Sequence, residues 1–194
     1  MKTLVIISHP RKNSLTFAVS NEIIRGLEEQ NHEIEILDLH ENNFDPLVFP
    51  VDEPDYSDES KVYSDVVENE MNRIRNVDNI IFVFPVWWHS IPAMLKGYID
   101  RVFNYGFAYG SNKLPVEKIR WIGLAGEPRS SFKKRGFHLN IEHHLNIGIS
   151  GFVGVEDSEV ELIYETLGEE VPEEKLEKHY AEIFNRSYLI GKEI

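Results

Sequence analysis

Two adjacent tryptophans and a histidine, Trp87, Trp88 and His89, lie two residues beyond an apolar run over residues 80–84. A continuous apolar run of this length is typical of a central parallel strand that is covered on both faces. Pro85 cannot donate a ladder hydrogen bond, so the strand ends there. Because ligands of open α/β sheets bind at the carboxyl ends of the strands, the large flat rings indicate a site for a planar aromatic ligand. The alternative is that the tryptophans only cap the core, where this residue is usually buried.

A second group of polar residues follows the first predicted strand, residues 3–8. His9 and Pro10 break this strand, and Ser14 is a suitable N-cap for a helix that runs to about residue 30. Such a junction directs free backbone N–H groups and a helix N-terminus at a ligand, which suits a phosphate. The alternative is a simple capped helix start with an incidental histidine. Neither a Gly-x-Gly-x-x-Gly nor a Walker pattern is present, which disfavours a Rossmann or P-loop site.

The fourth predicted strand, residues 118–126, ends in small residues. Gly123, Ala125 and Gly126 would let a ligand lie against the backbone. The predicted loop over residues 127–136 then carries a basic cluster in an otherwise acidic chain, namely Arg129, Lys133, Lys134 and Arg135. This cluster could pair with a ribose phosphate of a ligand, and the alternative is a solubilising loop.

Strands and helices alternate along the whole chain. We expect strands at residues 3–8, 32–39, 80–84, 118–126 and 159–164, and helices at 14–30, 60–76, from 92, 137–151 and from 172. This alternation is typical of a doubly wound α/β fold, and right-handed crossovers favour a flavodoxin-like five-stranded parallel sheet of order 2-1-3-4-5. Residues 40–60 are too long for an ordinary connection, although no residue role can be assigned there. Without repeats or linkers, residues 1–194 are expected to form one domain.

The composition narrows the classes of function. The formal net charge is −13, and residues 156–177 hold ten acidic side chains against the single Lys175, so nucleic-acid binding is disfavoured. The chain has no cysteine, which excludes disulfides and thiolate chemistry, and its histidines show no metal-binding spacing. The N-terminal apolar run is too short for a signal peptide and no segment is long enough to span a membrane, so a cytoplasmic protein is expected.

Residues 84–88, 91–103 and 106–109 closely resemble the flavodoxin-fold NAD(P)H:quinone oxidoreductases. This family includes DT-diaphorase, bacterial general-stress oxidoreductases and the ancillary oxidoreductases of potassium efflux systems. The resemblance implies FAD as the cofactor, with FMN as the alternative, and NAD(P)H as the electron donor. With such a donor, pairing of the basic cluster with a ribose phosphate would give NADPH an advantage over NADH. It also implies a homodimer that reduces quinones, or similar aromatic acceptors, by two electrons in a ping-pong reaction.

The resemblance implies three groups of flavin-binding residues. The loop after the first strand would contact the pyrophosphate and adenosine, and the segments after the third and fourth strands would hold the ring. The implied residues are His9, Ser14, Leu15 and Thr16; Pro85, Val86, Trp87, Trp88 and His89; and Leu124, Ala125, Gly126, Glu127 and Phe132. This chain has Gly-Leu-Ala-Gly at residues 123–126 where the family has Thr-Thr-Gly-Gly, so the hydroxyls are lost but the small residues are kept.

The family uses a tyrosine and a histidine six residues apart to stabilise negative charge on the flavin, and Phe132 and His138 have that spacing here. Because phenylalanine lacks the hydroxyl, His138 alone becomes the candidate catalytic donor. The alternative for His138 is a solvent-facing loop histidine. Tyr105, Phe107 and Tyr109 are implied to wall the substrate pocket of the partner subunit, although core packing explains them nearly as well.

Two other functions stay open at this level. A one-electron flavodoxin carrier would fit the acidic surface, but the phosphate loop of small FMN flavodoxins is absent. A regulatory subunit docked on a potassium efflux transporter would retain the flavin site, so motifs do not separate it from the enzyme. Steady NAD(P)H oxidation with a quinone separates the enzyme from the carrier, and co-purification with a transporter tests the regulatory role.

Overall fold

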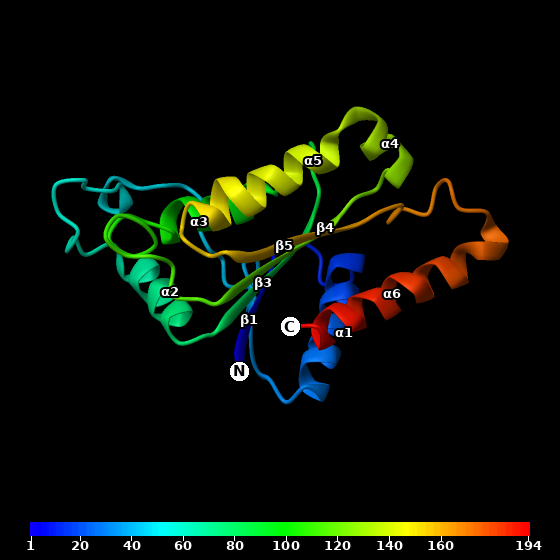
Figure 1. The fold of residues 1–194 in the computed structure, drawn as a ribbon, viewed down its shortest axis with the longest axis horizontal. Coiled ribbons are helices and arrows are strands. Elements are labelled where there is room, and N and C mark those ends of the chain that lie inside the picture. The colour runs from blue at the N-terminus through cyan, green and yellow to red at the C-terminus, as the bar shows by residue number, and fades with distance from the viewer.

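The computed structural model describes residues 1–194 as a twisted parallel sheet with helices on both faces (Figure 1). The strands are β1 (Lys2–Ile7), β2 (Glu33–Asp38), β3 (Asn79–Pro85), β4 (Lys118–Leu124) and β5 (Asp157–Ile163). Their order is β2-β1-β3-β4-β5, and all neighbouring strands pair in parallel. The predicted doubly wound fold and strand order are therefore confirmed.

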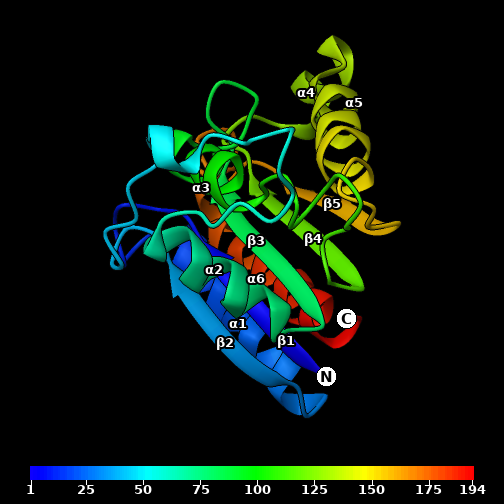
Figure 2. The same ribbon diagram turned by 90° about the vertical axis from the view of Figure 1, so that its left-hand side faces the viewer.

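Each face of the sheet has its own core. The helices are α1 (Leu15–Glu29), α2 (Asp65–Arg75), α3 (Ala93–Val102), α4 (Arg129–Arg135), α5 (Phe137–Glu142) and α6 (Leu176–Lys192). Apolar residues of α1 and α6 pack on one face, and those of α2, α3 and α5 pack on the other, as Figure 2 also shows. Every residue of β3 is buried, as a continuous apolar run in a central strand requires. β2 lies at the edge of the sheet, and only its last two residues, Leu37 and Asp38, are buried.

Two predictions about local structure need correction. Residues 127–136 are not a loop throughout, because α4 occupies most of them. Pro128 precedes this helix, three basic residues occupy its last turn, and Gly136 ends it in the left-handed region at φ 72°. The helix predicted from residue 60 begins only at Asp65. The helix predicted at 137–151 is α5, continued by a π-helical segment over His143–Gly151 (η2).

The long connection after β2 is ordered by a buried ion pair. A short 3₁₀ helix (η1, Pro50–Asp52) places Asp52 against Arg101 of α3, with 2.6 Å between Oδ2 and Nη2. The side-chain amide of Asn104 donates to the Asp52 carbonyl at 2.6 Å. A Cβ atom at Gly97 would lie 2.4 Å from that of Pro46, so the connection lies directly on α3. These contacts fix the connection, which had no assigned role, beside the helix that follows the tryptophan segment.

None of the helices combines the length and the apolar character that crossing a bilayer requires.

Candidate functional site

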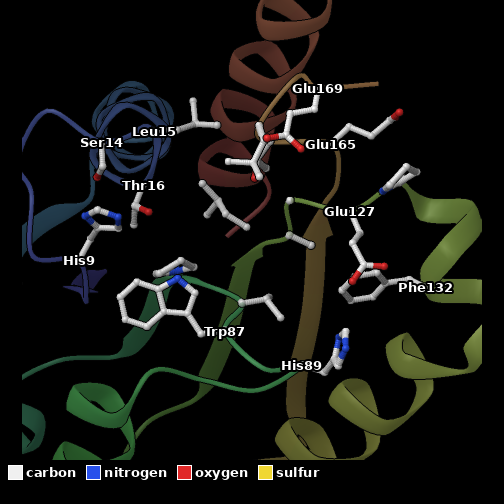
Figure 3. Close-up of a pocket in the computed structure, with 18 of the residues that line it drawn as sticks. His9, Ser14, Leu15, Thr16, Trp87, His89, Glu127, Phe132, Glu165 and Glu169 are labelled. Atoms are coloured by element: carbon white, nitrogen blue, oxygen red, sulfur yellow. The ribbon is translucent and has the colours of Figure 1, made fainter. Parts of the chain in front are cut away.

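A cavity of about 630 Å³ opens at the carboxyl ends of the central strands (Figure 3). Its walls come from the β1–α1 loop, the segment after β3, the β4–α4 segment and the β5–α6 connection. The lining includes every residue predicted to hold the cofactor: His9, Ser14, Leu15, Thr16, Pro85, Val86, Trp87, Trp88, His89, Leu124, Ala125, Gly126, Glu127 and Phe132. Residues that are far apart in the sequence thus meet in one cavity because parallel strands end at the same edge of the sheet.

The β1–α1 end of the cavity has a hydroxyl group without a partner. Ser14 is the N-cap residue of α1, with extended φ and ψ angles of −88° and 162°, but its side chain makes no capping hydrogen bond. Its Oγ is buried and unpartnered, and it lies beside His9 and Thr16 (Figure 3). A buried hydroxyl left unpaired costs about 1–3 kcal/mol, so a ligand that accepts this hydrogen bond at the helix N-terminus would remove that cost. The residues here fit a phosphate group.

His9 offers a second donor at this end. Its Nδ1 accepts a hydrogen bond from the backbone N–H of Arg11 at 3.0 Å, which assigns the ring proton of the neutral form to Nε2. Burial lowers the pKa of His9, so the neutral imidazole is favoured near neutral pH. The ring lies 6.3 Å from the Trp87 ring, between the phosphate end and the aromatic wall.

The tryptophan segment forms a tight turn in a strained conformation. Trp87 and Ser90 exchange two backbone hydrogen bonds of 3.1 and 3.0 Å. The enclosed residues, Trp88 and His89, have φ values of 52° and 56°, as in a type I′ turn, where Asn and Gly are strongly preferred. Each such residue costs about 1–2 kcal/mol relative to a right-handed conformation. The alternative that the tryptophans cap the core is wrong, because Trp88 is 98% exposed and Trp87 is 46% exposed.

A stack of two rings holds this turn in place. The imidazole of His89 lies 3.6 Å from the Phe137 ring, with 18° between the ring planes. Phe132, in the cavity wall, contacts the same histidine edge-on at 5.5 Å. The turn is therefore packed against the α4–α5 corner, and the exposed Trp88 side chain remains free at the mouth of the cavity.

The small residues after β4 have different roles. Gly126 and Ala125 line the cavity, as predicted. Gly123 does not, because a Cβ atom there would lie 2.9 Å from Leu162 and 3.0 Å from Val86. Close packing between strands, rather than approach to a ligand, therefore requires glycine at position 123.

The predicted catalytic and substrate residues lie outside this cavity. His138 lies in the first turn of α5, and its Nδ1 is 3.4 Å from the Phe132 carbonyl oxygen. Tyr105 and Tyr109 have rings 5.6 Å apart on the segment after α3, and Phe107 is buried in the core. Core packing thus accounts for Phe107. The roles of the other three residues stay predictions, since those of the tyrosines concern a partner subunit.

Sequence reasoning missed the β5–α6 wall. It contributes Glu165, Thr166, Leu167, Glu169 and Glu170, and the other missed lining residues are Arg11 and Pro128. The Glu165 N–H donates to the Glu127 carbonyl at 3.2 Å and the Thr166 N–H to that of Ala125 at 3.1 Å, which fixes this wall against the segment after β4. The charge pattern of the acidic run predicts only a solvated surface, although its position directly after β5 places it at the same edge of the sheet.

The four basic residues of α4 do not line the cavity. Arg135, from this cluster, instead donates to the Glu127 carboxylate at 3.2 Å. The predicted contact of the cluster with a ribose phosphate therefore has no support from the geometry, and a solvated helix surface accounts for these residues.

The chain is similar to known proteins in both sequence and fold. The family described as a flavodoxin-like fold matches residues 1–186. An uncharacterized NAD(P)H oxidoreductase of Escherichia coli, YcaK, is 40% identical over 171 residues, which cover 86% of this chain and 87% of that protein. NAD(P)H dehydrogenase [quinone] 1 of Cavia porcellus is 27% identical, over 84% of this chain and 68% of its own length. Among solved structures, the NAD(P)H:quinone oxidoreductase of Methanothermobacter marburgensis superposes with a TM-score of 0.86 at 25% identity, over 99% of this chain and 94% of that one.

Proposed function

The chain belongs to the flavodoxin-like fold family, and from this premise we propose that it is a flavin-dependent NAD(P)H:quinone oxidoreductase. The relatives with the NAD(P)H oxidoreductase and quinone dehydrogenase names support this activity. One observation carries the proposal: the exposed rings of the Trp87–Ser90 turn and the unpartnered Ser14 hydroxyl lie on one cavity. The first suits a planar ring system, and the second suits a phosphate.

When bound, the flavin supplies the redox chemistry by accepting a hydride from the nicotinamide and passing two electrons to the quinone. The chain's own residues would bind and orient the flavin. The N-terminus of α1, with Ser14 and the Nε2 proton of His9, would hold the phosphate end. Backbone groups of Ala125 and Gly126 would approach the polar edge of the ring, and Trp87 would cover its face.

We propose FAD rather than FMN as the resident flavin. The support is the extension of the cavity from the β1–α1 loop to the β5–α6 wall, which leaves room for an adenosine beyond the phosphate end. The flavin released from purified protein decides between FAD and FMN. Release of FMN alone would contradict FAD while leaving the activity itself in place.

We also propose a homodimer in which the segment after α3 reaches the partner's cavity. Tyr56, Tyr105, Tyr109 and Phe152 form a chain of ring contacts 5.2–5.6 Å apart, and the rings of Tyr56 and Phe152 are 70% and 65% exposed. Exposed apolar rings in such a cluster favour burial against another protein surface. Sedimentation of a clean monomer at micromolar concentration would contradict the dimer.

The activity is tested with flavin-loaded protein, NAD(P)H and a small benzoquinone. Donor and acceptor would share one cavity, so we expect ping-pong kinetics with parallel double-reciprocal lines. If the protein bound flavin but did not oxidise NAD(P)H, the proposed activity would be wrong. The one-electron carrier would then be the favoured function. The regulatory role is not favoured by the relatives, which carry enzyme names.

A further inference from the structure

The lining of the cavity contains one permanent cation. Arg11, in the β1–α1 loop, is the only lysine or arginine among the lining residues. Four carboxylates line the walls after β4 and β5, namely those of Glu127, Glu165, Glu169 and Glu170. Figure 3 shows three of these carboxylates on the side of the cavity away from His9. A flavin phosphate carries about two negative charges, so only the end of the cavity at Arg11 attracts it.

The main chain of Arg11 organises the donor groups at this end. Its N–H donates to Nδ1 of His9 at 3.0 Å, which leaves the Nε2 proton of that ring for a ligand. Its carbonyl accepts the N–H of Ser14 at 3.3 Å, beside the buried Ser14 hydroxyl that has no partner. The three residues therefore belong to one turn before α1, and each of them offers a different donor.

The side chain of Arg11 is free to bind a ligand. It is exposed and its guanidinium forms neither an ion pair nor a hydrogen bond. The next residue, Lys12, differs, because it is paired with Glu41 at 2.5 Å and does not line the cavity. Burial lowers the pKa of His9, and the nearby charge of Arg11 lowers it further. The charge of Arg11 thus acts on the end of the cavity where His9 and Ser14 offer their donors.

We propose that Arg11 supplies the countercharge for the flavin phosphate, so that the site selects flavins that carry a phosphate ester over riboflavin. The planar guanidinium has paired N–H donors that match two phosphate oxygens, while the N-terminus of α1, Ser14 and His9 would donate to the others. Riboflavin has the same ring but no phosphate, so it gains none of these contacts. This inference rests on the proposed function, because it names the residue that selects the cofactor of the same reaction.

The test measures Kd for FAD, FMN and riboflavin by quenching of flavin fluorescence, with the flavin-free protein at low salt. The three ligands share the ring, so differences among their Kd values report on the phosphate. We expect Arg11→Gln to weaken binding of FAD and FMN by roughly tenfold, and binding of riboflavin by less than about twofold. Added salt should reduce the difference between wild type and Arg11→Gln, because it screens the exposed charge.

Two further variants separate the charge of Arg11 from its place in the loop. Arg11→Lys keeps the positive charge and should recover most of the affinity for FAD and FMN. The matched control Lys12→Gln removes one positive charge from the same loop outside the cavity, and should leave all three Kd values close to those of wild type. The main-chain contacts of Arg11 with His9 and Ser14 remain in every variant, so thermal unfolding of the flavin-free protein should not change.

The outcomes distinguish this inference from the proposed function. Unchanged affinity for FAD and FMN in Arg11→Gln, or an equal loss for riboflavin, would overturn the inference while leaving the activity in place. An equal loss in Lys12→Gln would overturn it too, because net charge alone would then account for the effect. If wild type bound none of the three flavins, the proposed function would fail together with the inference.

Discussion

Nη2 of Arg101 in α3 lies 2.6 Å from Oδ2 of Asp52, with side chains that are 4% and 0% exposed. The second oxygen of Asp52 accepts the backbone N–H of Ser64 at 2.9 Å, and Nη1 of Arg101 donates to the Asp45 carbonyl at 2.5 Å. The pair therefore joins both ends of the connection before α2 to the helix that follows the tryptophan turn. Its role is to hold the connection after β2 against α3.

The substitution Asp52→Asn should destabilise the protein by about 3–5 kcal/mol, because the buried guanidinium of Arg101 loses its compensating charge. The measurement is the free energy of unfolding from urea denaturation. Asp100→Asn is the matched control on α3, since Asp100 forms an exposed pair with Lys96 and should cost less than about 1 kcal/mol. Equal losses in the two variants would show that the buried pair has no special role.

The same pair predicts how stability depends on pH. Burial alone would raise the pKa of Asp52, but hydrogen bonds from Ser64 and Arg101 outweigh it and hold this pKa below its ordinary value. A carboxyl whose pKa is lowered by folding stabilises the protein above its unfolded pKa, about 3.9, and this contribution is lost as pH falls through the folded pKa. Urea denaturation between about pH 7 and pH 3 should show a steeper loss below pH 4 in wild type than in Asp52→Asn.

Ser14→Ala should weaken flavin binding without destabilising the free protein. The Ser14 hydroxyl makes no capping bond, so its removal leaves nothing unpaired in the flavin-free state. A hydrogen bond to a phosphate is worth about 1.5–3 kcal/mol, or roughly ten- to a hundredfold in Kd. Flavin titration measures the first effect and thermal unfolding of the flavin-free protein the second.

Ser8→Ala is the control for Ser14, because its Oγ is also buried and unpartnered but Ser8 does not line the cavity. We expect flavin affinity to stay within about threefold of wild type there, below the net worth of one hydrogen bond. If the Ser14→Ala variant bound flavin as tightly as wild type, the flavin phosphate would not bind at this helix terminus.

Trp88→Asn should stabilise the protein but impair quinone reduction. Trp88 is 98% exposed, so little packing is lost, and asparagine tolerates a φ of 52° far better. We expect a gain of about 1 kcal/mol in unfolding free energy together with a fall in kcat/KM for the quinone. Trp88→Phe keeps the ring and the strain and should change both quantities little. Loss of stability in Trp88→Asn would show that the turn is not strained.

The sequence predicts the fold well because local patterns and chain connectivity determine it. The apolar run of residues 80–84 in β3, the alternating polar and apolar residues at the start of β2 and the strand–helix order were sufficient for the topology. The conformation of Trp88 and His89 could not be predicted, because these residue types rarely occupy a type I′ turn and the stack on Phe137 that holds them is a tertiary contact. The helix α4 was missed although Pro128 and Gly136 mark its ends, since its composition resembles a basic loop.

The site was predicted least well where segments that are distant in the sequence are brought together by strand pairing. Glu169 and Glu170 reach the cavity because β5 pairs with β4, which no local pattern reveals. The resemblance placed the catalytic donor at His138 through a spacing of six residues, but the spacing could not show that His138 would lie outside the cavity lining, with its Nδ1 3.4 Å from the Phe132 carbonyl oxygen.

The final prediction concerns the donor that stabilises negative charge as the flavin is reduced. His89 lines the cavity, whereas His138 does not, so His138 is proposed to act by positioning the α4–α5 corner. His89→Phe keeps a ring for the stack on Phe137 but removes both ring nitrogens, and should slow flavin reduction by NADH by roughly ten- to a hundredfold, as for one pre-organised donor. His138→Ala should slow it less and alter the pH profile little. Stopped-flow reduction of fully flavinated variants decides between them: a larger effect at His138 would restore it as the direct donor, and unchanged rates in both would leave main-chain groups to stabilise the charge.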